Sequence, residues 1–153
     1  MAKRSAGLLM YRRTISGEVE VFLVHPGGPF WAKKDKGAWS ICKGEYADGE
    51  QALEAAKREF EEETGFRAQG EFFELGEVKQ AGGKIVSAWA FAGDCDPAKL
   101  VSNPFRMEWP PRSGRMVEYP EVDRGGWFRM AQAREQILKS QEPFLDRLQR
   151  MLE

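Results

Sequence analysis

Residues 44–66, GEYADGEQALEAAKREFEEETGF, carry the strongest helix pattern in this chain of 153 residues. Asp48 suits a helix N-cap, Gln51 three residues later completes a capping box, and Gly65 stands where a C′ glycine belongs. Apolar side chains recur at helical spacing and give the helix one face for the core: Leu53, Ala56 and Phe60. We therefore predict a helix that begins after Asp48, ends before Gly65 and packs on a core.

The same helix gathers carboxylates on one side. Glu59, Glu62 and Glu63 are spaced i, i+3 and i+4, so at about 100° per residue they share an arc of roughly 100°. Like charges so placed repel each other, and a hard divalent cation would turn that repulsion into binding. Arg58 lies four residues before Glu62 and is placed to orient it. Taken alone, a Glu-rich helix face is more often simply solvated, so its context decides.

That context matches a family signature. Residues 44–66 resemble the Nudix box, GX5EX7REUXEEXGU, in which U is a bulky apolar residue. With residue types used at roughly 5–7% each, a chance match at every fixed position is on the order of a few in a billion. The fixed positions and then the two U positions are filled by Gly44, Glu50, Arg58, Glu59, Glu62, Glu63 and Gly65, and by Phe60 and Phe66.

The resemblance implies a fold, a metal and an activity. The implied fold class is α/β (α+β), a Nudix-type α/β/α sandwich with a mixed β-sheet. The implied cofactor is Mg²⁺ or Mn²⁺, held by Glu59, Glu62 and Glu63 and by the backbone carbonyl of Lys43. Glu50 and Arg58 are implied to stabilise the box by pairing, which counts Arg58 among the catalytic group. The implied enzyme is a Nudix pyrophosphohydrolase acting on phosphoric anhydrides.

The flanking segments predict a sheet around this helix. Alternating or continuous apolar runs indicate strands at 6–12, 19–25, 39–42, 71–79, 84–91 and 127–128, with 6–12 and 19–25 forming a hairpin and 84–91 lying inside the sheet. Gly82-Gly83-Lys84 is interpreted as a hairpin turn. Helices are predicted at 131–139 and 143–151. Residues 103–123 are rich in Pro and charge and predict a long loop, with a possible short strand near Met107.

One candidate site residue lies on that loop. Family members often place a further carboxylate shortly before a Trp-containing strand, and Tyr119-Pro-Glu-Val-Asp-Arg-Gly-Gly-Trp127 has this arrangement. Glu121 is the candidate for an added metal ligand or general base, and Asp123 is the second choice. The base that accepts a proton from the attacking water stays open among Glu63, Glu62 and Glu121.

The segment before the box bears on the substrate. Trp39-Ser-Ile-Cys-Lys-Gly44 resembles the Trp-x-x-Pro-Lys-Gly of dinucleoside polyphosphate hydrolases, with Cys42 in place of Pro. Lys43, Tyr46 and Trp39 are the predicted substrate-binding residues, and Lys43 can meet the phosphates of a long polyphosphate. Aromatic side chains that could stack on a base are Trp31, Tyr46, Trp89 and Phe105.

Composition narrows the class of protein. We expect one domain over residues 1–153, because this length suits a single core. Basic residues number 23 and acidic residues 24, so no bulk charge favours a nucleic-acid partner, and no apolar run is long enough to span a membrane. Cys42 and Cys95 are expected to be free thiols in the cytoplasm. The expected partner is a small-molecule nucleotide, and the protein is expected to be a monomer or homodimer.

The leading hypothesis is metal-dependent hydrolysis of a diphosphate linkage in a nucleoside-diphosphate-X substrate. A dinucleoside polyphosphate such as diadenosine tetraphosphate is preferred. One alternative is a housecleaning (d)NTP pyrophosphohydrolase. Another, from a different class, is a catalytically silent Nudix domain that binds a nucleotide and regulates a partner; the intact carboxylate box disfavours it.

Overall fold

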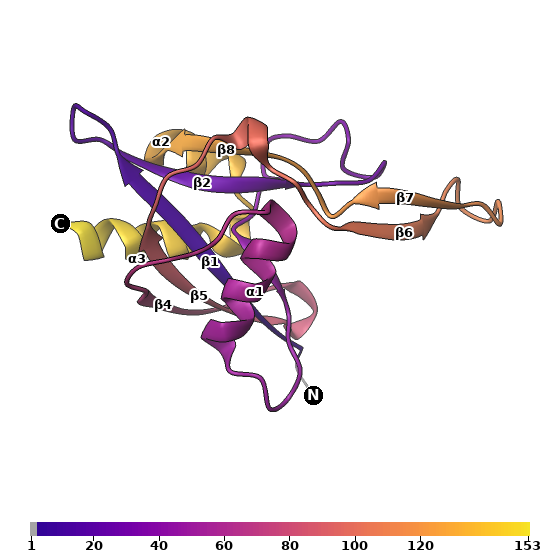
Figure 1. Cartoon of the computed structure of the whole chain (residues 1–153), viewed down its shortest axis with the longest axis horizontal. Helices are drawn as coiled ribbons and strands as arrows, with labels where there is room; N and C mark the ends of the chain where they lie inside the picture. Colours follow the sequence, from indigo (N-terminus) through magenta and orange to yellow (C-terminus); the bar gives the residue numbers. More distant parts are fainter. Residues whose placement is uncertain (1–2) are drawn as a thin grey trace.

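The computed structural model describes residues 3–153 and contains a six-stranded mixed sheet with helices on both faces (Figure 1). The strand order is β4 (Phe73–Lys79), β5 (Ile85–Ala92), β1 (Arg4–Arg13), β2 (Val19–Pro26) and β8 (Val122–Arg129), while β3 (Cys42–Glu45) also pairs with β1. The strand β1 lies inside the sheet, parallel to β5 and antiparallel to β2 and β3.

Alternation along the two central strands explains the layers. Successive side chains of a strand point to opposite faces, and in β1 and β2 both sets are apolar and buried. Leu8 and Phe22 join the cluster under α1 (Ala52–Thr64), which includes Phe60. Leu9 and Leu23 join the cluster under α2 (Met130–Gln136) and α3 (Glu142–Leu152). The α/β/α sandwich predicted from the sequence is confirmed.

The sheet divides where β1 changes partners. Tyr11–Arg13 pair with β2, whereas Ser5–Leu8 pair with β3, so β2 and β3 diverge from a common neighbour. Beyond Val21, β2 continues along β8, and only a bridge between Val24 and Ser40 links it to the segment before β3. The bridge places Ser40, which precedes the carboxylate box by four residues, beside Val24 near the end of β2.

The predicted elements are largely confirmed, with three corrections. The β1–β2 hairpin, β4 and β5 are present, and Ala81–Gly83 form the short 3-10 turn η1 between β4 and β5. The loop 103–123 instead contains a two-stranded hairpin, β6 (Pro104–Glu108) and β7 (Met116–Pro120), and includes the strand near Met107. The strand at 39–42 is shifted to β3, and the helix at 131–139 ends at Gln136.

The start of α1 also differs from the prediction. Gln51, not Asp48, is the N-cap residue, and no side chain caps the helix there. Gly49 has φ 95°, so the Asp48–Gly49 pair forms a separate turn before the helix. At the other end, Gly65 is left-handed with φ 78°, and its N–H donates to the Glu61 carbonyl, as the sequence predicted.

Two shorter 3-10 segments, η2 (Pro97–Lys99) and η3 (Lys139–Gln141), complete the regular structure. Among residues 3–153, no helix has the length and apolar character required to cross a bilayer. Cys42 and Cys95 are both free thiols.

Candidate active site

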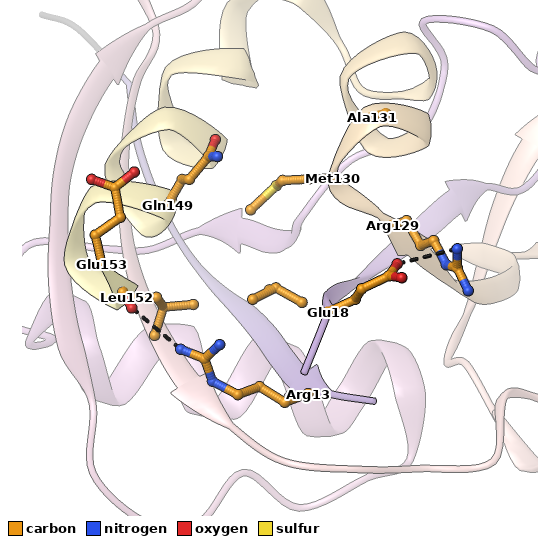
Figure 2. A pocket seen from close by; sticks show the side chains of 9 residues that line it. Arg13, Glu18, Arg129, Met130, Ala131, Gln149, Leu152 and Glu153 are labelled. Atoms are coloured by element: carbon orange, nitrogen blue, oxygen red, sulfur yellow. Dashed lines mark hydrogen bonds and ion pairs between the residues drawn. The ribbon is translucent and has the colours of Figure 1, made fainter. Parts of the chain in front are cut away.

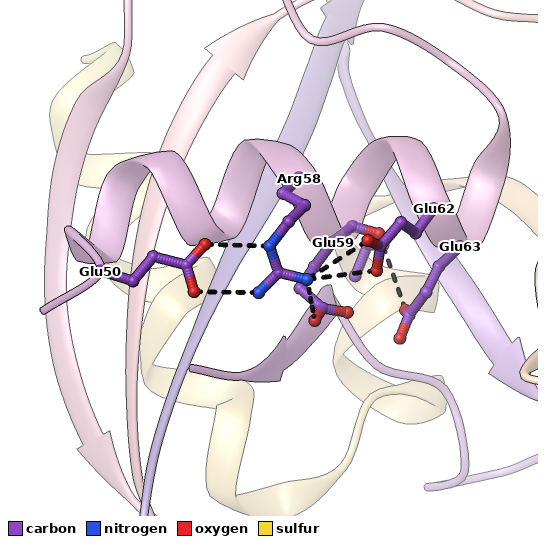
Figure 3. Close-up of polar contacts among 6 residues, drawn as sticks. Glu50, Arg58, Glu59, Glu62 and Glu63 are labelled. Carbon is purple, nitrogen blue, oxygen red and sulfur yellow. Dashed lines mark hydrogen bonds and ion pairs between the residues drawn. The ribbon is translucent and has the colours of Figure 1, made fainter. Parts of the chain in front are cut away.

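The Arg58 guanidinium gathers three carboxylates along α1 (Figure 3). It forms a bidentate pair with Glu50, with Nε–Oε2 at 2.9 Å and Nη2–Oε1 at 3.1 Å. Its Nη1 also donates to Glu59 Oε1 at 3.0 Å and to Glu62 Oε2 at 3.2 Å. The Glu50 hydrogen bond is the main cause that raises the pKa of Arg58, and the Arg58 hydrogen bond lowers the pKa of Glu50. The predicted pairing of Glu50 with Arg58 is confirmed.

Glu63 lies outside that network. Its carboxylate accepts a hydrogen bond from the Cys42 thiol, with Sγ–Oε2 at 3.3 Å. Burial is the main cause that raises the pKa of Glu63 to about 7, and the negative charges of Glu59 and Glu121 add to the rise. The Cys42 hydrogen bond and the charge of Lys43 oppose it. A carboxyl group with a pKa near neutrality suits proton transfer at physiological pH.

Glu121 reaches the same region from the turn between β7 and β8. Its N–H donates to the Asn103 carbonyl and its own carbonyl accepts from the Gly27 N–H, both at 2.9 Å. The Asn103 N–H in turn donates to the Glu62 carbonyl at 3.0 Å, which ties this segment to the last turn of α1. Burial raises the pKa of Glu121. Backbone hydrogen bonds on both sides therefore hold Glu121 beside the carboxylate helix.

A pocket of about 240 Å³ is lined by both Glu63 and Glu121 and by Lys43. Burial is the main cause that lowers the pKa of Lys43, and the charge of Glu63 opposes the shift. Among the described residues, Lys43 is the only cationic side chain in the lining, so it can meet a substrate phosphate. The remaining lining is mostly apolar: Val24, Pro26, Trp31, Ala38, Ser40, Ile41, Val122 and Leu138.

The carboxylates near Gly44 have the chemistry that a divalent cation requires. A Cβ atom at Gly44 would overlap the Glu59 carboxylate, so in its present position this carboxylate rests against a backbone without a side chain. Burial raises the pKa of Glu59, and the charges of Glu62 and Glu121 raise it further. These groups are oxygen donors that repel one another, which is the donor set that hard cations such as Mg²⁺ and Mn²⁺ prefer.

The side chains are arranged around Arg58 rather than around a common point. Within residues 3–153, no group of three or more His, Cys, Asp and Glu side chains lies close enough together to hold a metal ion. Arg58 draws Glu59 and Glu62 to itself, whereas Glu63 turns into the pocket. A bound cation would compete with the guanidinium for Glu59 and Glu62.

Two residues predicted to bind substrate lie outside this pocket. Trp39 is only 5% exposed, packs edge-on against Phe128 at 4.9 Å and donates its indole N–H to Asp35, so it is a core residue. Tyr46 lines a separate hollow together with Glu45, Ala47, Glu50 and Arg58. Of the three predicted substrate-binding residues, the structure places Lys43 in the pocket with Glu63 and Glu121.

Asp123 has a different partner from the one expected. Its Oδ1 lies 2.9 Å from Nδ1 of the fully buried His25 and 3.5 Å from the Arg124 guanidinium. The other ring nitrogen of His25 is within hydrogen-bond distance of the Lys34 carbonyl. Through these two contacts, His25 links the loop after β2, at Lys34, to Asp123 on β8. The sequence did not predict this role for the single histidine of the chain.

Gln141 is a supporting residue that the sequence did not indicate. It is fully buried, its Oε1 accepts from the Ile41 N–H at 2.9 Å, and its Nε2 donates to Ser40 Oγ at 3.0 Å. Ile41 and Ser40 line the pocket. A polar residue between two helices carries no pattern that would predict this long-range contact.

Figure 2 shows another hollow, of about 430 Å³, formed where the β1–β2 turn meets the start of α2 and the end of α3. Arg13 donates to the Leu152 carbonyl there, and Arg129 pairs with Glu18. None of the carboxylates of the Nudix box lines it, so the chemistry of the site belongs to the smaller pocket beside Glu63.

Comparisons with known proteins show the family and the fold of the chain. The NUDIX domain family model matches residues 1–148. The Ap4A hydrolase of C. elegans, solved as a binary complex, is 21% identical with a TM-score of 0.66, over 99% of this chain and 98% of that one. The NUDIX domain of Shewanella oneidensis NrtR, solved with ADP ribose, is 13% identical with a TM-score of 0.67, over 100% and 90%. No curated protein sequence matches the chain.

The mixed sheet lies between helices, and Glu63 of the glutamate-rich helix α1 lines a pocket. The chain belongs to the NUDIX family. It is therefore an enzyme of the class that acts on phosphoric anhydrides.

Proposed function

We propose that this enzyme hydrolyses a diphosphate linkage in a nucleoside-diphosphate-X substrate with a divalent metal, preferably a dinucleoside polyphosphate. The observation that carries the proposal is the pocket shared by Glu63, Glu121 and Lys43, which come from three separate segments. Carboxylates suit a metal and proton transfer, while the partly buried ammonium of Lys43 suits a phosphate. Their meeting in one pocket matches the needs of anhydride hydrolysis.

The roles divide by position. Glu59, Glu62, Glu63 and Glu121 would hold Mg²⁺ or Mn²⁺, with the Lys43 carbonyl as a further ligand. When bound, the cation supplies charge neutralisation on the diphosphate and a lowered pKa for the attacking water. Lys43 binds a phosphate, and Glu63, with its pKa of about 7 in the absence of metal, is our first choice to accept the proton of the water. Arg58 and Glu50 are positioning residues that orient the carboxylates.

The dinucleoside polyphosphate preference has two supports. The C. elegans Ap4A hydrolase resembles this chain over nearly its full length. A second hollow, of about 340 Å³, adjoins the pocket and shares Pro26, Trp31 and Glu121 with it, which leaves room for a substrate with more than one nucleoside. We also place the enzyme in the cytoplasm, where free thiols such as Cys42 and Cys95 persist.

The test compares substrates and one matched pair of variants. Diadenosine tetraphosphate, dGTP and ADP-ribose are each incubated with Mg²⁺ or Mn²⁺, and the products are separated. We expect diadenosine tetraphosphate to be cleaved fastest, and Glu63→Gln to lower kcat on the order of 100-fold or more, as removal of a general base does. Glu61→Gln, on the exposed side of the same helix, is the control and should leave kcat unchanged.

Other outcomes would redirect the proposal. Faster cleavage of dGTP would favour the housecleaning (d)NTP enzyme. Tight binding of a nucleotide without turnover would refute the enzyme and favour a nucleotide-binding regulator. Full activity in Glu63→Gln would remove the assigned role of Glu63.

A further inference from the structure

The β6–β7 hairpin stands apart from the main sheet (Figure 1). Its two strands pair with each other to form a separate two-stranded sheet. At its base, the backbone bonds of Asn103 and Glu121 tie the hairpin to α1 and to Gly27. The hairpin is thus an arm that starts at the candidate active site and is fixed to it at the root.

The arm lies directly against the turn after β2. A Cβ atom at Gly27 would lie 1.9 Å from the Pro120 carbonyl oxygen. Because this oxygen belongs to the backbone, it could not move aside without displacing the arm. A Cβ at Gly28, whose φ is 97°, would lie 3.1 Å from the Phe105 ring. Two consecutive glycines therefore permit the close approach of arm and turn, and this approach brings Phe105 over the segment that carries Phe30 and Trp31.

Between the arm and the turn lies the hollow of about 340 Å³, which we call the aromatic slot. Its walls are Phe30, Trp31, Phe105 and Met107, with Pro26, Gly27, Gly28 and Glu121 completing the lining. The Phe30 and Trp31 rings meet edge to face at 5.3 Å, and the Lys34 ammonium lies 3.9 Å from the Phe30 centroid. Pro26, Trp31 and Glu121 also line the pocket of Glu63 and Lys43, so the two hollows adjoin each other.

The four apolar side chains of the slot lie outside the hydrophobic core. Neither of the two hydrophobic clusters that hold the fold together includes Phe30, Trp31, Phe105 or Met107. Phe30 is 59% exposed, although exposing a large aromatic side chain to water is unfavourable. Three aromatic side chains and one methionine around a single hollow, outside the core clusters and beside the pocket of Glu63, indicate a binding surface for a flat apolar group.

We propose that the aromatic slot binds a nucleobase of the substrate by stacking, with little discrimination between bases. This inference rests on the proposed function. Among the described residues, Glu121 is the one charged side chain in the lining of the slot, so the walls offer faces for stacking and few groups to read the edge of a base. Stacking is tolerant because every base has a π face. The phosphates then run past Glu121 toward Lys43, whose ammonium lines the adjoining pocket.

Binding of product nucleotides tests the slot without requiring turnover. Isothermal titration in Mg²⁺ compares AMP, GMP and ribose 5-phosphate, which share a phosphate and a ribose but differ in the base. We expect AMP and GMP to bind within about threefold of each other, and ribose 5-phosphate to bind about tenfold more weakly or worse. Phe105→Ala should weaken AMP and GMP about tenfold and leave ribose 5-phosphate unchanged.

Two variants control the measurement. Phe105→Tyr keeps the ring and should retain AMP binding, while Phe73→Ala removes an exposed aromatic ring on β4, away from the slot, and should change nothing. Equal binding of AMP and ribose 5-phosphate, or unchanged AMP binding in a folded Phe105→Ala variant, would overturn the proposal that the slot binds a base. Loss of hydrolysis with AMP binding intact would count against the proposed function alone.

Discussion

Glu63 is predicted to destabilise the metal-free protein at and above neutral pH, and Glu63→Gln to remove that cost. The folded protein raises the pKa of this carboxyl from 4.5 to about 7, mainly by burial. A raised pKa favours the protonated form, so the stability contributed is complete below pH 4.5 and is lost as pH rises through about 7. At roughly 1.4 kcal/mol per unit, the loss is on the order of 3 kcal/mol.

The assay is urea unfolding in EDTA at several pH values between 5 and 8. We expect the free energy of unfolding of the wild type to fall, relative to Glu63→Gln, by on the order of 3 kcal/mol across this range. Glutamine keeps a carbonyl oxygen that can accept the Cys42 thiol, so the comparison isolates the charge. Glu61 is exposed, so the free energy of unfolding of Glu61→Gln should vary with pH in the same way as that of the wild type.

Mg²⁺ gives the second half of this prediction. Since the proposed cation would bind the ionised carboxylate, saturating Mg²⁺ should stabilise the wild type more than Glu63→Gln, and more at pH 8 than at pH 6. Parallel pH curves for wild type and Glu63→Gln in EDTA would refute the reasoning, because they would mean that burial does not disfavour the charge of Glu63.

Three further changes probe the supports of the site. Gly44→Ala should push the Glu59 carboxylate off the backbone and weaken activation by Mg²⁺ about tenfold or more, measured as the metal concentration for half-maximal rate, with little change in Tm. Arg58→Lys keeps the charge but loses the bidentate geometry, so kcat/KM should fall about 10–100-fold while urea unfolding shifts by about 1 kcal/mol or less. Gln141→Leu leaves the buried Ile41 N–H without its acceptor and should cost about 1–3 kcal/mol in urea unfolding; an unchanged midpoint would contradict that contact.

The carboxylate helix was predictable because its geometry is local. Spacing of i, i+3 and i+4 fixes which side chains share a face, and Gly65 ends the helix by its own backbone preference. The start was predicted wrongly because Asp48 and Gly49 form a turn of their own, and turn chemistry competes with capping for the same residue types. Local rules thus placed the face of the helix but not its first residue.

The arm was harder to predict. Pro and charged residues between 103 and 123 are typical of a loop, and they outweighed the alternation in Pro104-Phe-Arg-Met-Glu108, where Phe105 and Met107 share a face. A hairpin outside the main sheet has no core to fill, so its apolar pattern is short. The close contacts of Gly27 and Gly28 with the arm are tertiary contacts, which no spacing within one segment encodes.

Electrostatics explains why the site takes the arrangement it has without metal. Three of the carboxylates at the site, Glu59, Glu63 and Glu121, have pKa values raised chiefly by burial, so each would be more stable neutral or beside a positive charge. Arg58 supplies such a charge to Glu59 but makes no hydrogen bond or ion pair with Glu63 or Glu121 among the described residues. A divalent cation bound at these carboxylates would offset the cost of burying their negative charges. The folded protein therefore carries an energetic cost for its buried carboxylates. We expect metal binding to remove part of this cost, which would add to metal affinity. In the absence of metal, the same cost should make the protein less stable as the pH rises.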